Sequence, residues 1–435
     1  MPGLFDTIVA PITGLQRAAV TVLRVSGTDS WDVARSVFDR WPNDPQPCQM
    51  IYGRFVHDDD GYAVAFEEGA SFTGERSAEF SIHGSPASVR LLLQACLRAG
   101  ARSAEPGEFT QRAFLNGRID LTQAEAIRET VDALTDAQLR SANALRAGEL
   151  SRRVGEAREE VLRALTAIEA ATDFSEEIGG MDRPAVLSNI ERASEIVREL
   201  LSTAKRGRIV RDGLTIALVG RPNVGKSSLL NRLLGQERAI VTAIPGTTRD
   251  TVEEWADLSG VPCRLVDTAG LRDSLDPVER LGVERTKEAL ERADLIWLVV
   301  AANEPWDDDP VVEAYGERVR VVANKIDLAP CDHEGWIGVS ALTGEGIEGL
   351  LRLVAQESES IPGSTQVTVN ARHRPLLEGA LVGLVQAERT LTNGAPDDLA
   401  AVGLYDAAAR LGEITGDTAT PDMITRVFRD FCIGK

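Results

Sequence analysis

One segment of the sequence has the spacing of a phosphate-binding loop. Residues 220–227 read GRPNVGKS and fit the pattern G-x-x-x-x-G-K-[ST]. They follow an apolar run and precede a helical one, so they should connect a strand to a helix. The glycines would let backbone N–H groups turn onto phosphate oxygens, where a helix N-terminus adds a positive dipole end. Lys226 would then bridge the terminal phosphates and the Ser227 hydroxyl would bind Mg²⁺, whereas a chance glycine turn would lack this strand–loop–helix context.

Three further segments follow in the order that a GTPase requires. Residues 267–270 read DTAG, where the aspartate can reach Mg²⁺ through water and the glycine N–H can meet a γ-phosphate. Residues 324–327 read NKID, and the Asp327 carboxylate can accept two N–H bonds that guanine offers and adenine does not. Residues 340–342 read SAL and would close the base pocket. All follow predicted strands, where open sheets bind ligands, so together they predict GTP rather than ATP.

A loop between the first helix of this region and the next strand reads TTRD at residues 247–250. We expect Thr248 to close on Mg²⁺ and the γ-phosphate, although a polar loop without this role is the alternative. Leu271 follows DTAG where Ras-type enzymes have a glutamine that orients water, so another group must do this. Arg249, Arg272 or a monovalent cation could supply the missing transition-state charge. The predicted GTP site comprises Asn223, Val224, Gly225, Lys226, Ser227, Ser228, Thr242, Ala243, Ile244, Pro245, Gly246, Thr247, Thr248, Asp267, Thr268, Ala269, Gly270, Asn324, Lys325, Asp327, Ser340, Ala341 and Leu342.

The elements that must position these residues fall into four stretches. Residues 1–118 alternate short β-rich runs with turns and predict a small α+β domain. Residues 119–212 are rich in Ala, Leu, Glu and Arg with apolar residues at helical spacing. Residues 213–357 alternate strand-like and helical runs, which predicts a parallel sheet with crossover helices, and residues 358–435 return to helix. The prediction is a multidomain α/β plus α protein, with a P-loop GTPase (Ras-like) domain inserted into a discontinuous helical domain.

Composition excludes several classes of protein. The 435 residues contain 47 basic and 67 acidic side chains, and a net charge of −20 argues against gripping nucleic acid by bulk electrostatics. The longest apolar run, residues 295–302, is far shorter than the roughly 20 residues that span a bilayer. No basic leader precedes an apolar core at the N-terminus. The five cysteines form no CxxC pair and the four histidines have no metal-ligand spacing, so we expect neither disulfides nor zinc, and a reducing cytosol.

Longer motifs outside the nucleotide loops extend along the chain. They read DTIVAPI near the start, SFTGE at residues 71–75, EPGEFTQRAFLNGRIDLTQAEAI at residues 105–127 and FCIGK at the end. With GRPNVGKSSLLN, IPGTTRD and DTAGLR, they resemble the MnmE (TrmE) family of tRNA-modifying GTPases over essentially the whole length. The resemblance implies an N-terminal folate-binding and dimerisation domain, and a helical domain interrupted by the G domain.

The resemblance also implies an activity. Members of this family hydrolyse GTP in a potassium-dependent way as homodimers whose G domains approach each other. With a flavoprotein partner, MnmG (GidA), in a heterotetramer or larger complex, they install an aminomethyl or carboxymethylaminomethyl type of group on carbon 5 of the wobble uridine of certain tRNAs. A folate, 5-formyl- or methylene-tetrahydrofolate, supplies the one-carbon unit. We therefore expect a cytoplasmic protein with Mg²⁺ and K⁺ as cofactors and no membrane association. A ribosome-assembly GTPase and a nucleotide-gated scaffold are the alternatives.

Matching positions suggest further site residues. Glu279 resembles a glutamate that orients water indirectly, although a solvated helix carboxylate is the alternative. Cys432 lies in the C-terminal tail near the folate site and could be catalytic, or it could be a buried structural cysteine. Residues 13–19 read TGLQRAA where the family has a glycine-rich run, so we expect a different loop shape there. The matching ligands are Asn223, Thr242, Ile244 and Thr247 for K⁺, Ser227 and Thr248 for Mg²⁺, and Arg24, Glu79, Arg118 and Lys435 for folate.

Overall fold

The computed structural model describes residues 6–14, 16–173, 181–236, 253–268, 287–305, 309–359, 368–429, 431–432 and 434. The chain forms two compact units, one of Met1–Arg128 with Ala408–Lys435 and one of Glu129–Ala407. The four-part division predicted from the sequence has other boundaries and stays a prediction.

A mixed six-stranded sheet forms the centre of the first unit, in the order β3-β4-β5-β2-β1-β6. Only β1 and β6 pair in parallel. Along β2, residues on the core face, such as Leu23 and Val25, alternate with more exposed ones, and the core face packs on α1 and α2. The elements are β1 (Ile8–Pro11), β2 (Val20–Ser26), α1 (Ser30–Val37), β3 (Met50–Arg54), β4 (Asp60–Phe66), β5 (Ser77–His83), α2 (Pro86–Arg98) and β6 (Arg102–Ser103).

Both ends of the chain contribute to this unit. The helix α3 (Glu108–Leu115) precedes the second unit, α4 (Leu121–Asp132) continues into it at Glu129, and α16 (Pro421–Arg429) follows it. Leu121, Ala124, Phe428 and Phe431 share one buried cluster. The C-terminal helix therefore packs on segments that lie about 300 positions earlier in the sequence, within the same compact unit.

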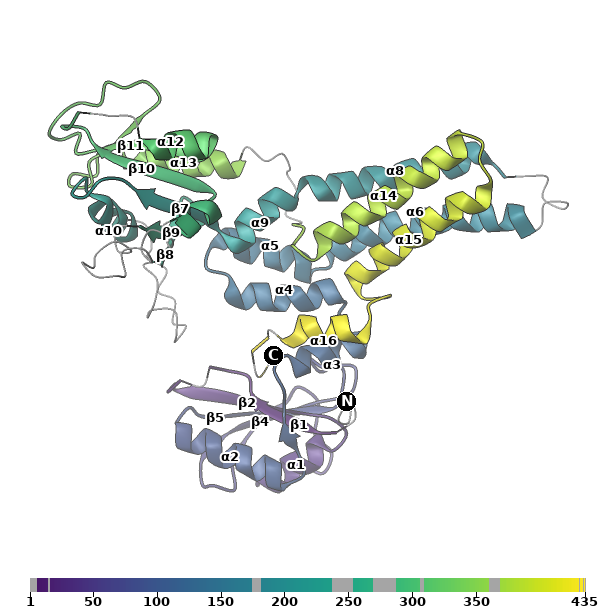
Figure 1. Cartoon of the computed structure of the whole chain (residues 1–435). Coiled ribbons are helices and arrows are strands. Elements are labelled where there is room, and N and C mark those ends of the chain that lie inside the picture. The colour runs from purple at the N-terminus through teal and green to yellow at the C-terminus, as the bar shows by residue number, and fades with distance from the viewer. Residues whose placement is uncertain are drawn as a thin grey trace, which may run out of the picture. The chain divides into compact units, whose positions relative to one another are not determined.

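A helical bundle makes up one part of the second unit (Figure 1). Its long helices are α6 (Glu149–Asp173), α8 (Arg183–Ser202), α14 (His373–Thr392) and α15 (Asp397–Thr415), and α15 continues into the first unit from Ala408. The shorter α5 (Asp136–Arg146) starts with a capping box at Thr135, and α9 (Ala204–Asp212) leads to the first strand of the next sheet. Thr203 separates α8 from α9.

The remainder of the second unit is an α/β layer structure. Its sheet has the order β12-β11-β10-β7-β9-β8, and all pairs are parallel except β8 with β9. Leucines and valines of α10 and α13 pack on one face of the sheet. The predicted parallel sheet with crossover helices is confirmed, and β8 is an additional edge strand that the sequence analysis missed. The elements are β7 (Leu214–Val219), α10 (Lys226–Gln236), β8 (Glu253–Leu258), β9 (Val261–Asp267), β10 (Leu295–Ala301), α12 (Pro310–Tyr315), β11 (Val319–Asn324), β12 (Ile337–Gly338) and α13 (Ile347–Glu359).

Candidate functional site

The phosphate loop connects β7 to α10 and depends on close backbone approaches. Gly220 and Gly225 have φ of 146° and 95°, in the region that favours glycine. A Cβ at Gly220 would lie 2.1 Å from the Val299 carbonyl oxygen, and one at Gly225 would lie 2.3 Å from Asn324 Nδ2. The buried Lys226 donates from Nζ to the carbonyls of Gly220 and Arg221, both at 2.9 Å. The loop is therefore tightly wrapped around the lysine that the sequence assigned to the phosphates.

A hydroxyl and a carboxylate meet at the start of α10. Ser227 donates from Oγ to Asp267 Oδ2 at 2.9 Å, and Asp267 is 3% exposed at the end of β9. The neighbouring Thr268 donates its hydroxyl to the Leu218 carbonyl at 2.8 Å, which ties β9 to β7. Hydroxyl and carboxylate oxygens are hard ligands of the kind that Mg²⁺ prefers. Ser227 and Asp267 thus fit a magnesium site.

The predicted base-binding segments also lie together. Asn324 is 2% exposed, donates from Nδ2 to the Val224 carbonyl at 2.9 Å, and accepts the Ala341 N–H at Oδ1 at 3.0 Å. Ser340 donates its hydroxyl to Asp327 Oδ1 at 2.5 Å. Asn324 therefore links the phosphate loop to residues 340–342 through two hydrogen bonds. Exposed side chains of the predicted set, which can meet a ligand without rearrangement, are Asn223, Ser227, Ser228, Asp327 and Leu342.

Part of the predicted site cannot be placed. Thr248, predicted to close on Mg²⁺, Glu279, predicted to orient water, and Lys435, predicted to bind folate, lie outside the described residues. The same holds for Thr242, Ala243, Ile244, Pro245, Gly246, Thr247, Arg249, Ala269, Gly270, Leu271 and Arg272.

The predicted folate ligands in the first unit include a close ion pair. Arg24 on β2 and Glu79 on β5 are directly opposite each other in the sheet, and Arg24 donates from Nε to Glu79 Oε1 at 2.8 Å. The Arg24 guanidinium lies 4.6 Å from the ring centre of Phe72 and 5.5 Å from that of Phe109, which is cation–π distance. Arg118 is exposed and lies against Gly74, where a Cβ would be 3.0 Å from Arg118 Cγ. The SFTGE segment therefore contacts both predicted arginines.

A buried network that the sequence analysis missed supports this segment. Arg112 is 3% exposed and donates to Glu75, Asp6 and Glu108 at 3.0–3.1 Å. Arg102 also donates to Asp6 at 2.6 Å, and this hydrogen bond holds the pKa of the Asp6 carboxyl below its usual range. The network joins the DTIVAPI, SFTGE and EPGEF motifs. The motifs themselves were visible in the sequence, but the sequence analysis assigned no role to Asp6, Glu75, Glu108 or Arg112.

Two family models match the chain. A family model described as the MnmE helical domain matches residues 121–432, and one described as the GTP-binding protein TrmE N-terminus matches residues 7–118. The tRNA modification GTPase MnmE of Symbiobacterium thermophilum is 42% identical over 454 residues, which cover 99% of this chain and 99% of that protein. The chain belongs to the MnmE family of tRNA modification GTPases. The MnmE protein of Chloroflexus aurantiacus is 43% identical over 452 residues, covering 99% of this chain and 100% of that protein.

Membership in the MnmE family confirms the predicted fold class and makes the chain a GTPase of tRNA modification. Among solved structures, the G domain of the T. maritima FeoB iron transporter is 29% identical, with matches over 34% of this chain and 98% of that chain and a TM-score of 0.26. Within the described ranges, no helix is both long enough and apolar enough to cross a membrane.

The thiol in the C-terminal tail of this MnmE-family chain is exposed. Cys432 lies beyond α16, and its carbonyl accepts the Gly107 N–H at 3.3 Å. An exposed side chain does not fit the alternative of a buried structural cysteine. Its catalytic role stays a prediction.

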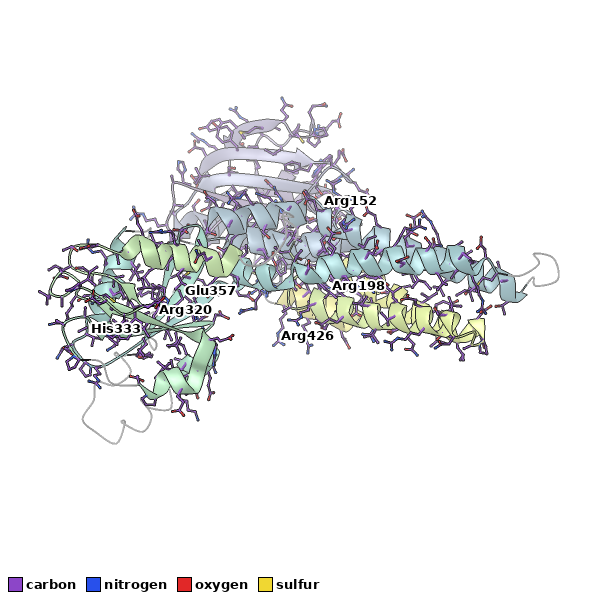
Figure 2. All side chains as sticks on the ribbon, turned by 90° about the horizontal axis from the view of Figure 1, so that it is seen from above. Arg152, Arg198, Arg320, His333, Glu357 and Arg426 are labelled. Atoms are coloured by element: carbon purple, nitrogen blue, oxygen red, sulfur yellow. The ribbon has the colours of Figure 1, made fainter. Side chains whose placement is uncertain are left out.

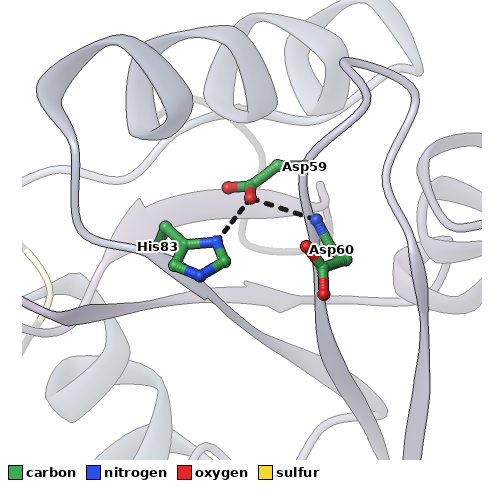
Figure 3. A group of neighbouring side chains, drawn as sticks. All are labelled: Asp59, Asp60 and His83. Carbon is green, nitrogen blue, oxygen red and sulfur yellow. Dashed lines mark hydrogen bonds and ion pairs between the residues drawn. The ribbon is translucent and has the colours of Figure 1, made fainter.

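Imidazoles and carboxylates gather at the β3–β4 turn, where sequence spacing predicted no such group (Figure 3). His83 Nδ1 lies 2.6 Å from Asp59 Oδ1, which also accepts the Asp60 N–H at 3.0 Å. The Ser88 hydroxyl donates to the other oxygen of Asp59, and His57 Nε2 lies 3.8 Å from it. Burial lowers the pKa of His57, whereas the hydrogen bond to Asp59 raises the pKa of His83. Because protein donors already satisfy the Asp59 carboxylate, we interpret the group as a structural ion pair.

Proposed function

We propose that this chain hydrolyses GTP in a potassium-dependent way and acts with the flavoprotein MnmG (GidA) and a folate one-carbon donor. Together they would modify carbon 5 of the wobble uridine of certain tRNAs, with an aminomethyl or carboxymethylaminomethyl type of group. One observation supports this most: a phosphate-loop site and the Arg24–Glu79 pair, at two of the predicted folate positions, occur on the same chain.

In the nucleotide site, each side chain has a distinct task. Lys226 and the loop N–H groups hold the terminal phosphates, and Asp327 accepts the two N–H groups of the guanine edge. Ser227 and Thr248 would hold Mg²⁺, and Asp267, which accepts the Ser227 hydroxyl, would assist them. Bound Mg²⁺ supplies positive charge against the charge that develops on the phosphate oxygens. Glu279 helps to orient the attacking water.

The K⁺ site is proposed around Asn223. This residue is exposed and adopts φ of 65°, a left-handed conformation that asparagine tolerates better than most residues. Thr242, Ile244 and Thr247 complete the proposed ligand set. A cation here would supply the charge that an arginine finger provides in other GTPases.

Potassium dependence is tested by GTP turnover in KCl against NaCl at equal ionic strength. We expect the parent protein to turn over GTP at least about tenfold faster in KCl, since one well-placed transition-state charge is worth tenfold or more in rate. Asn223→Ala should remove most of the difference between the salts, whereas Asn393→Ala, in the helical bundle, should keep it. Equal turnover of the parent in both salts would contradict the mechanism.

For folate, the proposed ligands are Arg24, Glu79, Arg118 and Lys435. A carboxylate suits the N–H edge of a pterin, and guanidinium or ammonium groups suit an anionic glutamyl tail. Phe72 and Phe109 add flat apolar surface next to Arg24. The exposed thiol of Cys432 is available to take part in the chemistry.

The assembly is proposed to be a cytoplasmic homodimer that joins MnmG in a heterotetramer or larger complex. With a net charge of −20, this subunit contributes only local contacts to tRNA. A more basic partner then carries most of the electrostatic attraction, because phosphate binding rests on Lys and Arg.

Nucleoside mass spectrometry of tRNA tests the whole function. A deletion strain should lack the modified wobble uridine, and the parent gene should restore it. Arg24→Ala should fail to restore it while the purified variant keeps GTP turnover, because its side chain lies in the first unit. Wobble uridines that stay unchanged in the deletion strain would refute the function.

A further inference from the structure

The helix after the phosphate loop carries an arginine that the nucleotide motifs do not include. Leu229, Leu230 and Leu233 of α10 are buried in the core of the α/β sheet, so the helix is held firmly. Arg232 lies half-buried beside them. Its Nε donates to the Ala341 carbonyl at 2.8 Å, and its terminal nitrogen donates to the Leu342 carbonyl. One guanidinium therefore binds two successive carbonyls of the base loop, residues 340–342.

The base loop depends on polar contacts for its shape. Leu342 is 77% exposed, so its side chain contributes little packing. Ser340 bonds to Asp327, and the Ala341 N–H bonds to Asn324, which fixes the first half of the loop. Arg232 fixes the second half through the carbonyls of Ala341 and Leu342.

We propose that Arg232 is a positioning residue for guanine recognition. It holds the base loop to the helix that begins at Lys226 and Ser227. The residues for the base and those for the phosphates are then fixed relative to each other. Hydrogen bonds from a charged donor are stronger than neutral ones, which suits them to this task. A loop already held in its binding conformation costs little ordering when the ligand arrives. The proposal rests on the guanine pocket assigned above.

The test measures the affinity of the full chain for fluorescent mant-GDP and mant-ADP. Arg232→Ala should weaken GDP binding about tenfold, as expected for losing charge-assisted bonds at a partly exposed site, and change ADP binding less than about twofold. In steady state, KM for GTP should rise by the same factor with kcat unchanged. Arg232→Lys should recover part of the affinity, because an ammonium can reach one of the two carbonyls.

Arg320→Ala is the matched control (Figure 2). Arg320 is also partly exposed, at the start of β11, where it bonds to the Glu317 and Val319 carbonyls and to Glu357 at 2.7 Å. Its loss should lower thermal stability to a similar degree and leave GDP affinity within twofold of the parent.

The outcomes distinguish a failure of the guanine pocket from a failure of the role of Arg232. A parent protein with no preference for GDP over ADP would overturn the guanine pocket itself. A parent preference that Arg232→Ala fully retains would overturn only the role of Arg232. Equal losses for GDP and ADP would also overturn it, because the effect would then lie at the phosphates.

Discussion

At the scale of single residues, burial fixes the polar side chains of the nucleotide site. Asp267 and Asn324 are 3% and 2% exposed, and both have hydrogen-bond partners in the protein. Leaving a buried polar group unpaired costs about 1–3 kcal/mol, so these side chains have few alternative conformations. Ser227 and Asp327 are exposed but each bonds to a neighbouring site residue. The described part of the candidate site is therefore held in place by the protein's own hydrogen bonds.

The Asp59–His83 pair gives a prediction about pH. The fold raises the pKa of His83, first through its hydrogen bond to Asp59, so folding favours protonated His83. That stabilisation is fully present below the unfolded value of about 6.5 and is lost as pH rises through the higher folded pKa. His83→Gln should lower the melting temperature by about 1 °C at pH 6 and have no effect at pH 9.

Differential scanning fluorimetry at the two pH values is the measurement. In an Asp59→Asn background the pH-dependent effect of His83→Gln should disappear, since the partner charge is gone. A larger effect at pH 9 than at pH 6 would contradict the assignment.

Residues of the nucleotide motifs could be predicted because their spacing is fixed by contacts with one ligand. Arg232 and Arg112 could not. The partners of Arg232 are backbone carbonyls, which leave no mark on the sequence. Arg112 bonds to Asp6, 106 positions earlier, and no local pattern connects the two. The carboxylates around the buried Arg112 are brought together only by the tertiary structure.

At the scale of elements, the missed strand shows where local patterns fail. Residues 253–258 read EEWADL, with acidic residues at half of the positions, and form β8 at the edge of the sheet. Charged residues on edge strands discourage pairing with other chains, so the pattern is polar although the element is a strand. The break between α8 and α9 is similar. Thr203 donates both its N–H and its hydroxyl to the Leu200 carbonyl, at 3.1 and 2.7 Å. These local bonds compete with the regular hydrogen bonds of a helix, and the spacing of apolar residues does not reveal them.

The crossing of α14 and α15 gives a prediction for element packing. A Cβ at Gly383 would lie 2.5 Å from the Gly403 carbonyl oxygen, and one at Gly403 would lie 2.7 Å from that of Gly383. Gly383→Ala should therefore push the helices apart and lower the free energy of unfolding by about 1–3 kcal/mol. Urea unfolding followed by circular dichroism measures the loss, and hydrogen exchange should locate it in α14.

Gly155→Ala is the control for this crossing. Gly155 lies within α6, and a Cβ there would meet nothing within 4 Å. The substitution should stabilise the chain by about 0.5–1 kcal/mol through helix propensity. A Gly383→Ala protein as stable as Gly155→Ala would show that the helices are not closely packed.

At the scale of the whole molecule, many basic side chains of the helical bundle are paired. Arg152 and Arg153 pair with Glu156, Arg163 pairs with Glu159, and Arg192 lies 3.1 Å from Glu160 (Arg152 is labelled in Figure 2). These pairs leave little net positive charge along the bundle, in line with the total of −20. The net charge is counted from the sequence alone, whereas the pairing of these arginines needs the fold.

The packing of the C-terminal tail has a consequence for how the protein is made. Phe428 and Phe431 fill the cluster around Leu121, and a Cβ at Gly434 would lie 2.1 Å from the Pro11 carbonyl oxygen. The first unit is thus complete only after Glu129–Ala407 has been synthesised, on the order of tens of seconds at about 5–20 residues per second. A ribosome that stalls within the G domain leaves its chain without the last pieces of that unit. A chain without residues 408–435 therefore lacks part of the unit that carries the Arg24–Glu79 pair.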